Sequence, residues 1–232
     1  MKKVISSLAL MIIGILVLTQ SVLAYPGENK KVFFIHHSTG AIYWEGQNNK
    51  GLKYYLEKND FEANDVDYWD GGTDPQDFYD LFSSEASWGI IGDSDIVLFK
   101  SCFPASGIDS NHTLKQYKQY YRGLYEVFLA HSDVLFVPMS TPPLPKQMTT
   151  KAQATRAMKF DKWLTHRFLT DYTGNNLAPF RLHQLLRTKK GYLQKKYVLD
   201  PQDGHPKKKS GNVLGKAMIK HLNKTLIKYQ AQ

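Results

Sequence analysis

The chain has 232 residues, of which 42% are hydrophobic, and it carries a formal net charge of +9 at pH 7. Its single cysteine, Cys102, cannot form an internal disulfide, which excludes a small secreted module built on disulfides. Much of the basic excess lies in residues 189–196 and 207–209, and it suits anionic glycans, lipid head groups or a solvated surface. No nucleic-acid-binding motif accompanies this charge, so we expect no nucleic-acid partner.

The start of the chain, residues 1–24, predicts a secretory signal peptide. Two lysines follow the first methionine, residues 8–18 form an apolar run, and residues 22–24 (VLA) suit a cleavage site. The run is shorter than the roughly 20 residues that a membrane span needs. We therefore expect residues 25–232 to be one exported domain, periplasmic or extracellular, with no membrane span after cleavage. An uncleaved N-terminal anchor is the alternative.

Predicted strands and helices alternate along the remaining chain. Apolar runs predict strands at residues 31–36, 65–69, 95–99 and 134–138, with a fifth within 176–183. Amphipathic patterns predict helices at residues 49–58, 75–82, 113–131, 149–169 and 212–228. This alternation is typical of a parallel sheet covered by helices. We expect an α/β fold, a flavodoxin-like three-layer α/β/α sandwich with a mostly parallel sheet of about five strands.

The first informative stretch is residues 31–40, which read KVFFIHHSTG. A buried strand ends there at His36, and Ser38 follows at the start of a loop or helix. Open α/β sheets bind ligands at the carboxyl ends of their strands, so Ser38 could aim its Oγ and its own N–H into a cleft. The alternative is that Ser38 only caps the next helix.

The second informative stretch is the turn-rich loop of residues 200–206, ahead of the last predicted helix. Here the imidazole of His205 could take a serine proton near pH 7, and the carboxylate of Asp203 could fix its tautomer. Loops after the first and last strands of such a sheet can share one rim, so Ser38 and His205 can meet. The alternative is a simple turn with an exposed His205.

Together these elements resemble the SGNH (GDSL-like) hydrolase superfamily over nearly the whole mature chain. Ser38 stands where that family has its nucleophilic serine, and Asp203 and His205 stand where it has its aspartate and histidine. Gly71 and Gly72 follow the second predicted strand, where the family has its oxyanion glycine. The resemblance implies the SGNH hydrolase fold, an acyl-enzyme formed from an ester or thioester, and no metal or organic cofactor.

The chain departs from the family pattern at the nucleophile. The family reads Gly-Asp-Ser, whereas this chain has His36 and His37 before Ser38, which indicates a divergent branch. Two adjacent histidines could form a metal site, but neighbouring residues of a strand point to opposite faces. We therefore expect no metal.

A second departure concerns the acid that orients His205. In the family the aspartate lies three residues before the histidine, and here that position is Gln202. Asp203 lies two residues before His205 and Asp200 lies five before it. We favour Asp203 and keep Asp200 as the alternative.

The third departure is at the oxyanion hole, where the family's asparagine after the third strand has no evident counterpart. We expect the N–H groups of Ser38 and Gly72 to hold the oxyanion, with Ser101 or Cys102 as a third donor. Loss of one such donor can lower the rate about a hundredfold. The thiol of Cys102 is also a rival nucleophile for His205, since cysteine is intrinsically more nucleophilic than serine. A buried, inert thiol is the other interpretation.

An aromatic pair, Tyr43 and Trp44, follows Ser38 closely. Aromatic rings stack well on sugars, so the pair is a candidate substrate contact, with ordinary core packing as the alternative. The sequence as a whole predicts an exported serine esterase that hydrolyses acyl esters, including acetyl esters, of a small molecule or polysaccharide. The alternatives are an O-acyltransferase that uses the same site, or a non-catalytic glycan- or lipid-binding module with the fold retained.

Overall fold

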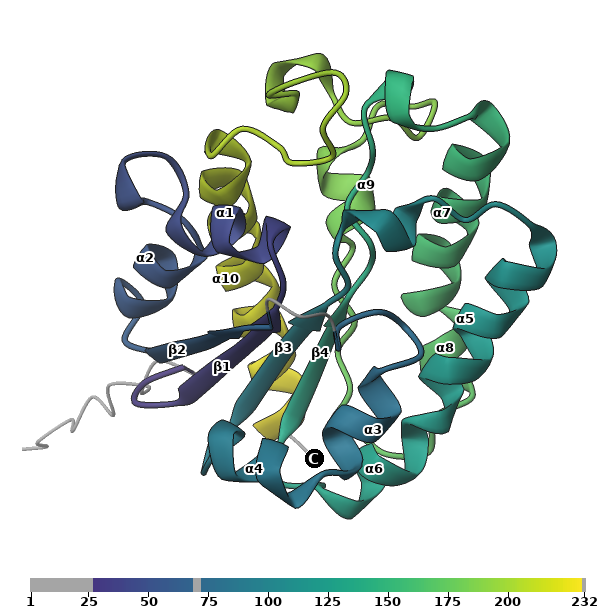
Figure 1. Cartoon of the computed structure of the whole chain (residues 1–232). Coiled ribbons are helices and arrows are strands. Elements are labelled where there is room, and N and C mark those ends of the chain that lie inside the picture. The colour runs from purple at the N-terminus through teal and green to yellow at the C-terminus, as the bar shows by residue number, and fades with distance from the viewer. Residues whose placement is uncertain (1–26, 69–71, 231–232) are drawn as a thin grey trace, which may run out of the picture.

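The computed structural model describes residues 27–68 and 72–230 of the chain. Its sheet has four parallel strands in the order β2-β1-β3-β4. The strands are β1 (Lys31–His36), β2 (Glu62–Asp67), β3 (Ile96–Lys100) and β4 (Leu135–Met139). This is the order of a flavodoxin-like sheet, so the predicted fold class is confirmed (Figure 1). Because the strands are parallel, their carboxyl ends meet at one edge of the sheet.

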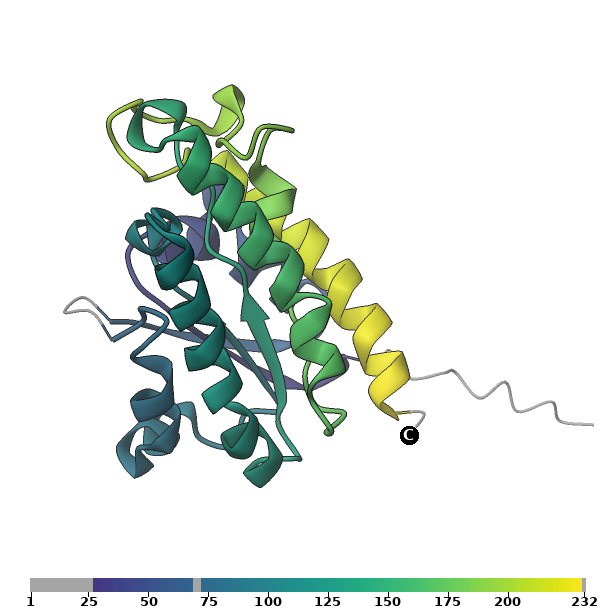
Figure 2. The same ribbon diagram turned by 90° about the vertical axis from the view of Figure 1, so that its right-hand side faces the viewer.

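Helices cover both faces of the sheet. One face packs against α1 (Thr39–Glu45), α2 (Leu52–Glu57), α9 (Leu182–Leu186) and α10 (Lys209–Gln230). The other face packs against α3 (Phe78–Ser83), α4 (Glu85–Ile91), α5 (Asn111–Gly123), α6 (Tyr125–Ala130), α7 (Lys151–Leu164) and α8 (Arg167–Thr170). Short 3-10 helices are η1 (Gln47–Asn49), η2 (Phe103–Ser106), η3 (Lys146–Met148) and η4 (Lys195–Tyr197). Figure 2 shows the yellow α10 and the teal α5 on opposite sides of the strands.

The continuous apolar runs in the strands follow from this two-sided burial. In β1, Val32 and Phe34 belong to the core under α1 and α10, whereas Phe33 and Ile35 belong to the core under α3 and α5. Successive strand residues point to opposite faces, so both sets must be apolar. The same alternation places His36 on the face of α1, beside the loop that carries Ser38.

Several predicted boundaries differ from those observed. The second strand begins at Glu62, three residues before the predicted start, because its amino-terminal half is polar and gives no apolar signal. The predicted helix over residues 113–131 is two helices, α5 and α6, which meet at Leu124. The predicted helix over 149–169 is likewise divided into α7 and α8. The helices α1, α4 and α9 have at most seven residues each, too few for a clear periodic pattern.

The predicted fifth strand is present only as two bridges and not as a regular strand. Residues 177–180 form two isolated parallel bridges with β4, Phe136 with Leu177 and Met139 with Phe180. The segment therefore occupies the position of a fifth strand beside β4. Pro179 lies in it, and proline has no N–H to continue a ladder.

The predicted signal peptide, residues 1–24, and the expected start of the domain at residue 25 lie outside the described residues. Among the helices of residues 27–68 and 72–230, none combines the length and apolar character required to cross a membrane.

A buried amide fixes this fifth segment to the sheet. The Nδ2 of Asn176 donates to the carbonyls of Phe128 (2.8 Å), His131 (3.0 Å) and Val134 (2.9 Å). Asn176 thus connects the end of α6, the following turn and the entry to β4 to the segment that precedes Leu177. Unpartnered buried carbonyls are unfavourable, so this side chain stabilises the turn between α6 and β4.

We expect Asn176→Ala to lower the free energy of unfolding by about 2–4 kcal/mol, because it removes several buried hydrogen bonds at once. Urea denaturation checks this value. The neighbouring exposed residue gives the control, since Asn175→Ala should change the free energy by less than about 0.5 kcal/mol. Equal effects of the two substitutions would contradict the assignment.

Candidate active site

Two segments far apart in the sequence meet at the carboxyl edge of the sheet. The Oγ of Ser38, after β1, is in hydrogen-bond contact with Nε2 of His205, 167 residues later and just ahead of α10. Nδ1 of the same imidazole lies 2.6 Å from Oδ1 of Asp203. The structure therefore brings together a hydroxyl, an imidazole and a carboxylate in the order that nucleophilic catalysis requires.

The backbone holds Ser38 in an unusual conformation, with φ 50° and ψ −88°. Left-handed backbone at a non-glycine residue costs about 1–3 kcal/mol and tends to occur at functional sites. Gly40 makes the turn possible, because a Cβ at this position would lie 2.2 Å from Cβ of His36. The Ser38 side chain forms no capping bond to α1, so its interpretation as a helix cap is wrong.

The loop that carries His205 is fixed by hydrogen bonds to Asp203 and by packing against Phe103. Asp203 Oδ1 also accepts the backbone N–H of His205 at 3.0 Å, so one carboxylate oxygen fixes both the chain and the ring. The ring packs edge-on against Phe103, with 5.0 Å between centroids. A Cβ at Gly204 would lie 2.3 Å from the Phe103 ring, so the loop approaches η2 closely only because this residue is glycine.

Of the two candidate acids, Asp203 contacts His205. The carboxylate of Asp200 instead accepts the backbone N–H of Gln202 at 2.9 Å, within its own turn. Burial by itself would raise the pKa of Asp203, but the hydrogen bonds from His205 outweigh it and hold that pKa below its usual value. Asp203 is therefore a carboxylate at neutral pH and can fix the tautomer of the imidazole.

A network of polar side chains lies behind the nucleophile. His36 is fully buried, and its Nε2 lies 2.9 Å from Oδ2 of Asp65. Its Nδ1 lies 3.8 Å from Oδ1 of Asp67. Asp65 and Asp67 are alternate residues of β2 and point to the same face, next to β1. The first histidine of the His-His-Ser sequence thus connects β1 to Asp65 through Nε2, while its Nδ1 lies near Asp67 without a hydrogen bond among the described residues.

The first of the predicted oxyanion donors is not free in this structure. The backbone N–H of Ser38 donates to Oδ1 of Asp67 at 3.1 Å. A carboxylate this close would repel a developing oxyanion. The prediction that this N–H faces an open oxyanion position is therefore corrected, and the N–H becomes available only when Asp67 releases it.

The structure describes three of the other predicted oxyanion residues, Gly72, Ser101 and Cys102. Gly71 lies outside the described residues, and Gly72 has φ 82°, in the left-handed region that favours glycine. The hydroxyl of Ser101 is fully buried and has no hydrogen-bond partner within the described part of the chain. Cys102 is also buried, and its Sγ lies 3.8 Å from Oγ1 of Thr39. The imidazole contacts Ser38, so the geometry favours the hydroxyl over the Cys102 thiol as nucleophile.

Tyr43 and Trp44 are not placed to contact a substrate, and this prediction is corrected. Tyr43 is 0% exposed and Trp44 is 7% exposed, and both belong to the core between α1, α2 and α10. Burial raises the pKa of Tyr43, and its hydroxyl has no hydrogen-bond partner among the described residues. The pair lies on the inner side of α1, where apolar rings face the sheet rather than solvent.

Lys100 is a further residue of the site, and the sequence reading did not include it. This lysine ends β3 and is fully buried, with Nζ 3.3 Å from the carbonyl oxygen of His37. Burial lowers its pKa to about 8, although Cys102 and Asp67 oppose the shift. That carbonyl and the N–H of Ser38 belong to one peptide unit, so an ammonium binds one end and a carboxylate the other. A lysine directly after the apolar run IVLF was the signal that could have revealed it.

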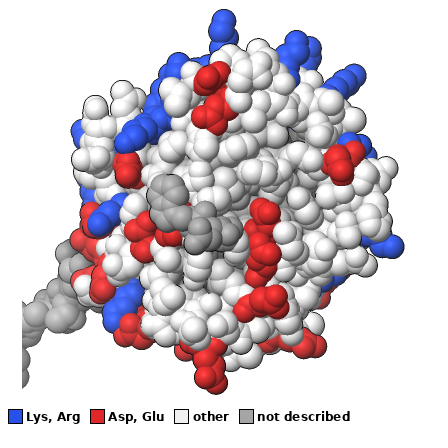
Figure 3. Space-filling model, viewed as in Figure 1, with Lys and Arg blue, Asp and Glu red and all other residues white. Residues whose placement is uncertain are grey.

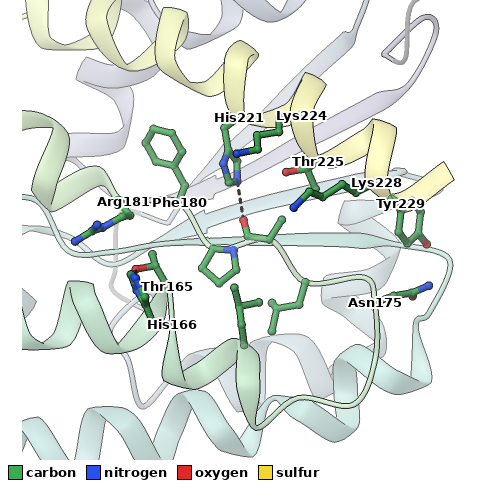
Figure 4. A pocket seen from close by; sticks show the side chains of 14 residues that line it. Thr165, His166, Asn175, Phe180, Arg181, His221, Lys224, Thr225, Lys228 and Tyr229 are labelled. Atoms are coloured by element: carbon green, nitrogen blue, oxygen red, sulfur yellow. Dashed lines mark hydrogen bonds between the residues drawn. The ribbon is translucent and has the colours of Figure 1, made fainter. Parts of the chain in front are cut away.

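A cavity of about 500 Å³ lies elsewhere, between residues 175–181 and α10 (Figure 4). His221 lies in its wall and donates from Nε2 to the carbonyl of Ala178 at 2.9 Å. Burial lowers the pKa of His221, which keeps the ring neutral near pH 7. None of Ser38, Asp203 and His205 lines this cavity, so it is separate from the candidate active site.

No protein-family model matches the chain, and no curated protein matches it. Several solved structures do match the chain. A lipase, Lip_vut3, from a goat rumen metagenome is 9% identical with a TM-score of 0.61, over 83% of this chain and 97% of that one. The psychrotrophic esterase EstA from Pseudoalteromonas sp. is 14% identical with a TM-score of 0.55, over 85% and 99%.

The chain has the fold of the SGNH (GDSL-like) hydrolases. A family two carbohydrate esterase from Clostridium thermocellum shares it at 11% identity and a TM-score of 0.50, over 85% of this chain and 64% of that one. At these identities the likeness concerns the fold, and it confirms the resemblance predicted from the sequence at that level.

The buried Lys100 gives a test through stability. Its pKa is lower in the fold than in the unfolded chain, so the unfolded chain binds more protons between pH 8 and 10.5, and stability rises with pH there. Lys100→Met removes this dependence. We expect the unfolding free energy of the variant minus that of the wild type to decrease by about 2 kcal/mol from pH 7 to 9.5.

Urea denaturation at several pH values measures this difference. The exposed Lys220 provides the matched control, because Lys220→Met should give a difference that is flat over the same range. A flat difference for Lys100→Met as well would show that the ammonium is not buried.

Proposed function

We propose that the chain is a serine esterase that hydrolyses acyl esters through Ser38, His205 and Asp203. The observation that carries the proposal is the contact of Ser38 Oγ with His205 Nε2, together with the 2.6 Å separation of Nδ1 from Asp203. The SGNH hydrolase fold, shared with proteins named as a lipase, an esterase and a carbohydrate esterase, supports it.

In the proposed reaction, Ser38 Oγ transfers its proton to Nε2 of His205 and attacks the ester carbonyl carbon. The tetrahedral intermediate collapses as the imidazolium gives this proton to the leaving alcohol, and an acyl-serine remains. Water then attacks the acyl-serine by the same route in reverse. Asp203 accepts a hydrogen bond from the Nδ1–H of the ring throughout and stabilises the imidazolium, while the proton stays on Nδ1.

The oxyanion of this intermediate would require the N–H of Ser38 to exchange Asp67 for the substrate oxygen. Displacement of the Asp67 carboxylate by the substrate achieves this, and the Lys100 ammonium on the same peptide unit favours donation from that N–H. The N–H of Gly72 and the unpartnered hydroxyl of Ser101 are the further donors we propose.

A carbohydrate ester is one candidate substrate of this class. Acetyl groups on a polysaccharide suit an exported enzyme, and export rests on the predicted signal peptide. One structural neighbour is named as a carbohydrate esterase, which supports a carbohydrate ester.

The nucleophile is tested by labelling with a serine-reactive fluorophosphonate and by turnover of p-nitrophenyl acetate. We expect the wild type to label at Ser38, and Ser38→Ala to lose the label and at least about 10³-fold in kcat. Cys102→Ala should keep the label. Loss of turnover only with Cys102→Ala would refute the assignment.

The same measurements separate the alternative functions. No label and no turnover in the wild type would favour the binding module, and transfer to an added alcohol in preference to water would favour the acyltransferase.

The orienting acid is tested with a matched pair of carboxylates from one loop. We expect Asp203→Asn to lower kcat by about 10²–10⁴-fold with little change in KM, since the amide favours the wrong imidazole tautomer. Asp200→Asn keeps the Ser38–His205–Asp203 contacts and should leave kcat within about twofold. The reverse result would make Asp200 the orienting acid.

A further inference from the structure

A cavity of about 500 Å³ lies beside the loop that carries His205. Its walls come from three segments: η3 after β4, the turn of residues 188–195, and the loop of residues 198–207. No residue of the Ser38, His205 and Asp203 cluster lines it. Nothing in the proposed esterase chemistry uses this space.

The cavity has an apolar side. Leu193 is buried in its wall, and Val198, Leu199 and Pro201 complete the apolar lining. Leu199 is 60% exposed, which leaves a large aliphatic side chain open to solvent at the edge of the cavity. An apolar chain placed here would remove this leucine from water, at about 25 cal/mol for each Å² covered.

The remainder of the lining is basic. Lys146, Lys195 and Lys207 line the cavity, and no aspartate or glutamate does. None of these three ammonium groups forms an ion pair with an acidic side chain of residues 27–68 or 72–230. The nearby Asp200 does not line the cavity. In Figure 3 basic side chains stand along much of the upper rim, and acidic ones lie just below that rim as well as over the centre and lower part of the face.

The cavity is tied to the candidate active site through the backbone. Val198 and Pro206 form an antiparallel bridge, and the N–H of Lys207 donates to the carbonyl of Tyr197 at 2.7 Å. These bonds close the loop that holds Asp203 and His205. Lys207 follows His205 by two residues, so their Cα atoms are at most about 7 Å apart.

We propose that this cavity binds the anionic, amphiphilic part of the ester substrate, with its negative group on Lys146, Lys195 and Lys207 and its apolar chain on Leu199. The substrate role rests on the proposed esterase function. The binding site itself rests on the cavity's lining, so the two are tested separately.

Binding is measured on the Ser38→Ala protein, which removes turnover. The probes are monododecyl phosphate and dodecylphosphocholine, both below their micelle concentrations; they share a chain and differ in net charge. We expect tighter binding of dodecyl phosphate by isothermal titration calorimetry, weakened by 0.5 M NaCl. Equal affinity for the two probes would overturn the proposal.

The lining lysines are compared with a control of equal charge. We expect the triple substitution Lys146→Gln, Lys195→Gln and Lys207→Gln to weaken dodecyl phosphate binding about tenfold, since each solvated ion pair contributes modestly. The control replaces Lys189, Lys190 and Lys196, which are exposed and do not line the cavity. Equal weakening in both triples would assign the binding to general surface charge and overturn the site.

The substrate role is tested by hydrolysis of lysophosphatidylglycerol and lysophosphatidylcholine of one chain length. We expect the ratio of kcat/KM for the anionic over the zwitterionic ester to fall about tenfold in the lining triple and to stay constant in the control triple. An unchanged ratio, with turnover that still depends on Ser38, overturns the substrate role. Absence of any Ser38-dependent turnover of p-nitrophenyl acetate overturns the esterase proposal instead, whatever the binding result.

Discussion

The contact between the Ser38 hydroxyl and the His205 imidazole depends on one peptide unit, the one that joins His37 to Ser38. Its carbonyl accepts a hydrogen bond from the buried ammonium of Lys100, and its N–H donates a hydrogen bond to the carboxylate of Asp67. These two charged groups come from β3 and β2, the two neighbours of β1 in the sheet. The strand that presents the serine is thus held from both sides at the point where it ends.

This arrangement is unfavourable for stability taken by itself. Ser38 adopts a left-handed backbone, and a lysine and a histidine are fully buried beside it. Such features persist only where the surrounding structure compensates, and here the compensation is mutual: Asp65 pairs with His36, while Asp67 and Lys100 hold opposite ends of the peptide unit. The same features hold the Ser38 hydroxyl against the His205 imidazole.

The His-His-Ser sequence acquires a physical meaning in this setting. Where the family that the chain resembles has Gly-Asp-Ser, the first histidine here binds the Asp65 carboxylate of β2. Gly40 follows because the His36 side chain leaves no space for another Cβ. At the other end of the site, the loop that carries His205 also borders a cavity lined by lysines and apolar side chains. Under the proposals above, substrate binding and proton transfer would both use this loop.

The sequence by itself determined the layered fold and indicated that Ser38 and His205 meet at one rim, with Asp203 favoured over Asp200 as the orienting acid. Continuous apolar runs such as DIVLF signal a strand buried on both faces, and the position of Ser38 and His205 in loops beside the first strand and the last helix follows from the order of elements. These signals are local, because a hydrophobic period or a turn residue can be recognised within a short stretch of sequence.

The contacts that surround the site were decided only by the tertiary structure. Whether Tyr43 and Trp44 face solvent or core, whether Asp67 occupies the Ser38 N–H, and whether Lys100 is buried all depend on residues about 20 to 180 positions away that the fold brings together. Local propensity carries no information about those partners, since a side chain's burial and its hydrogen bonds are set by whatever the folded chain places next to it.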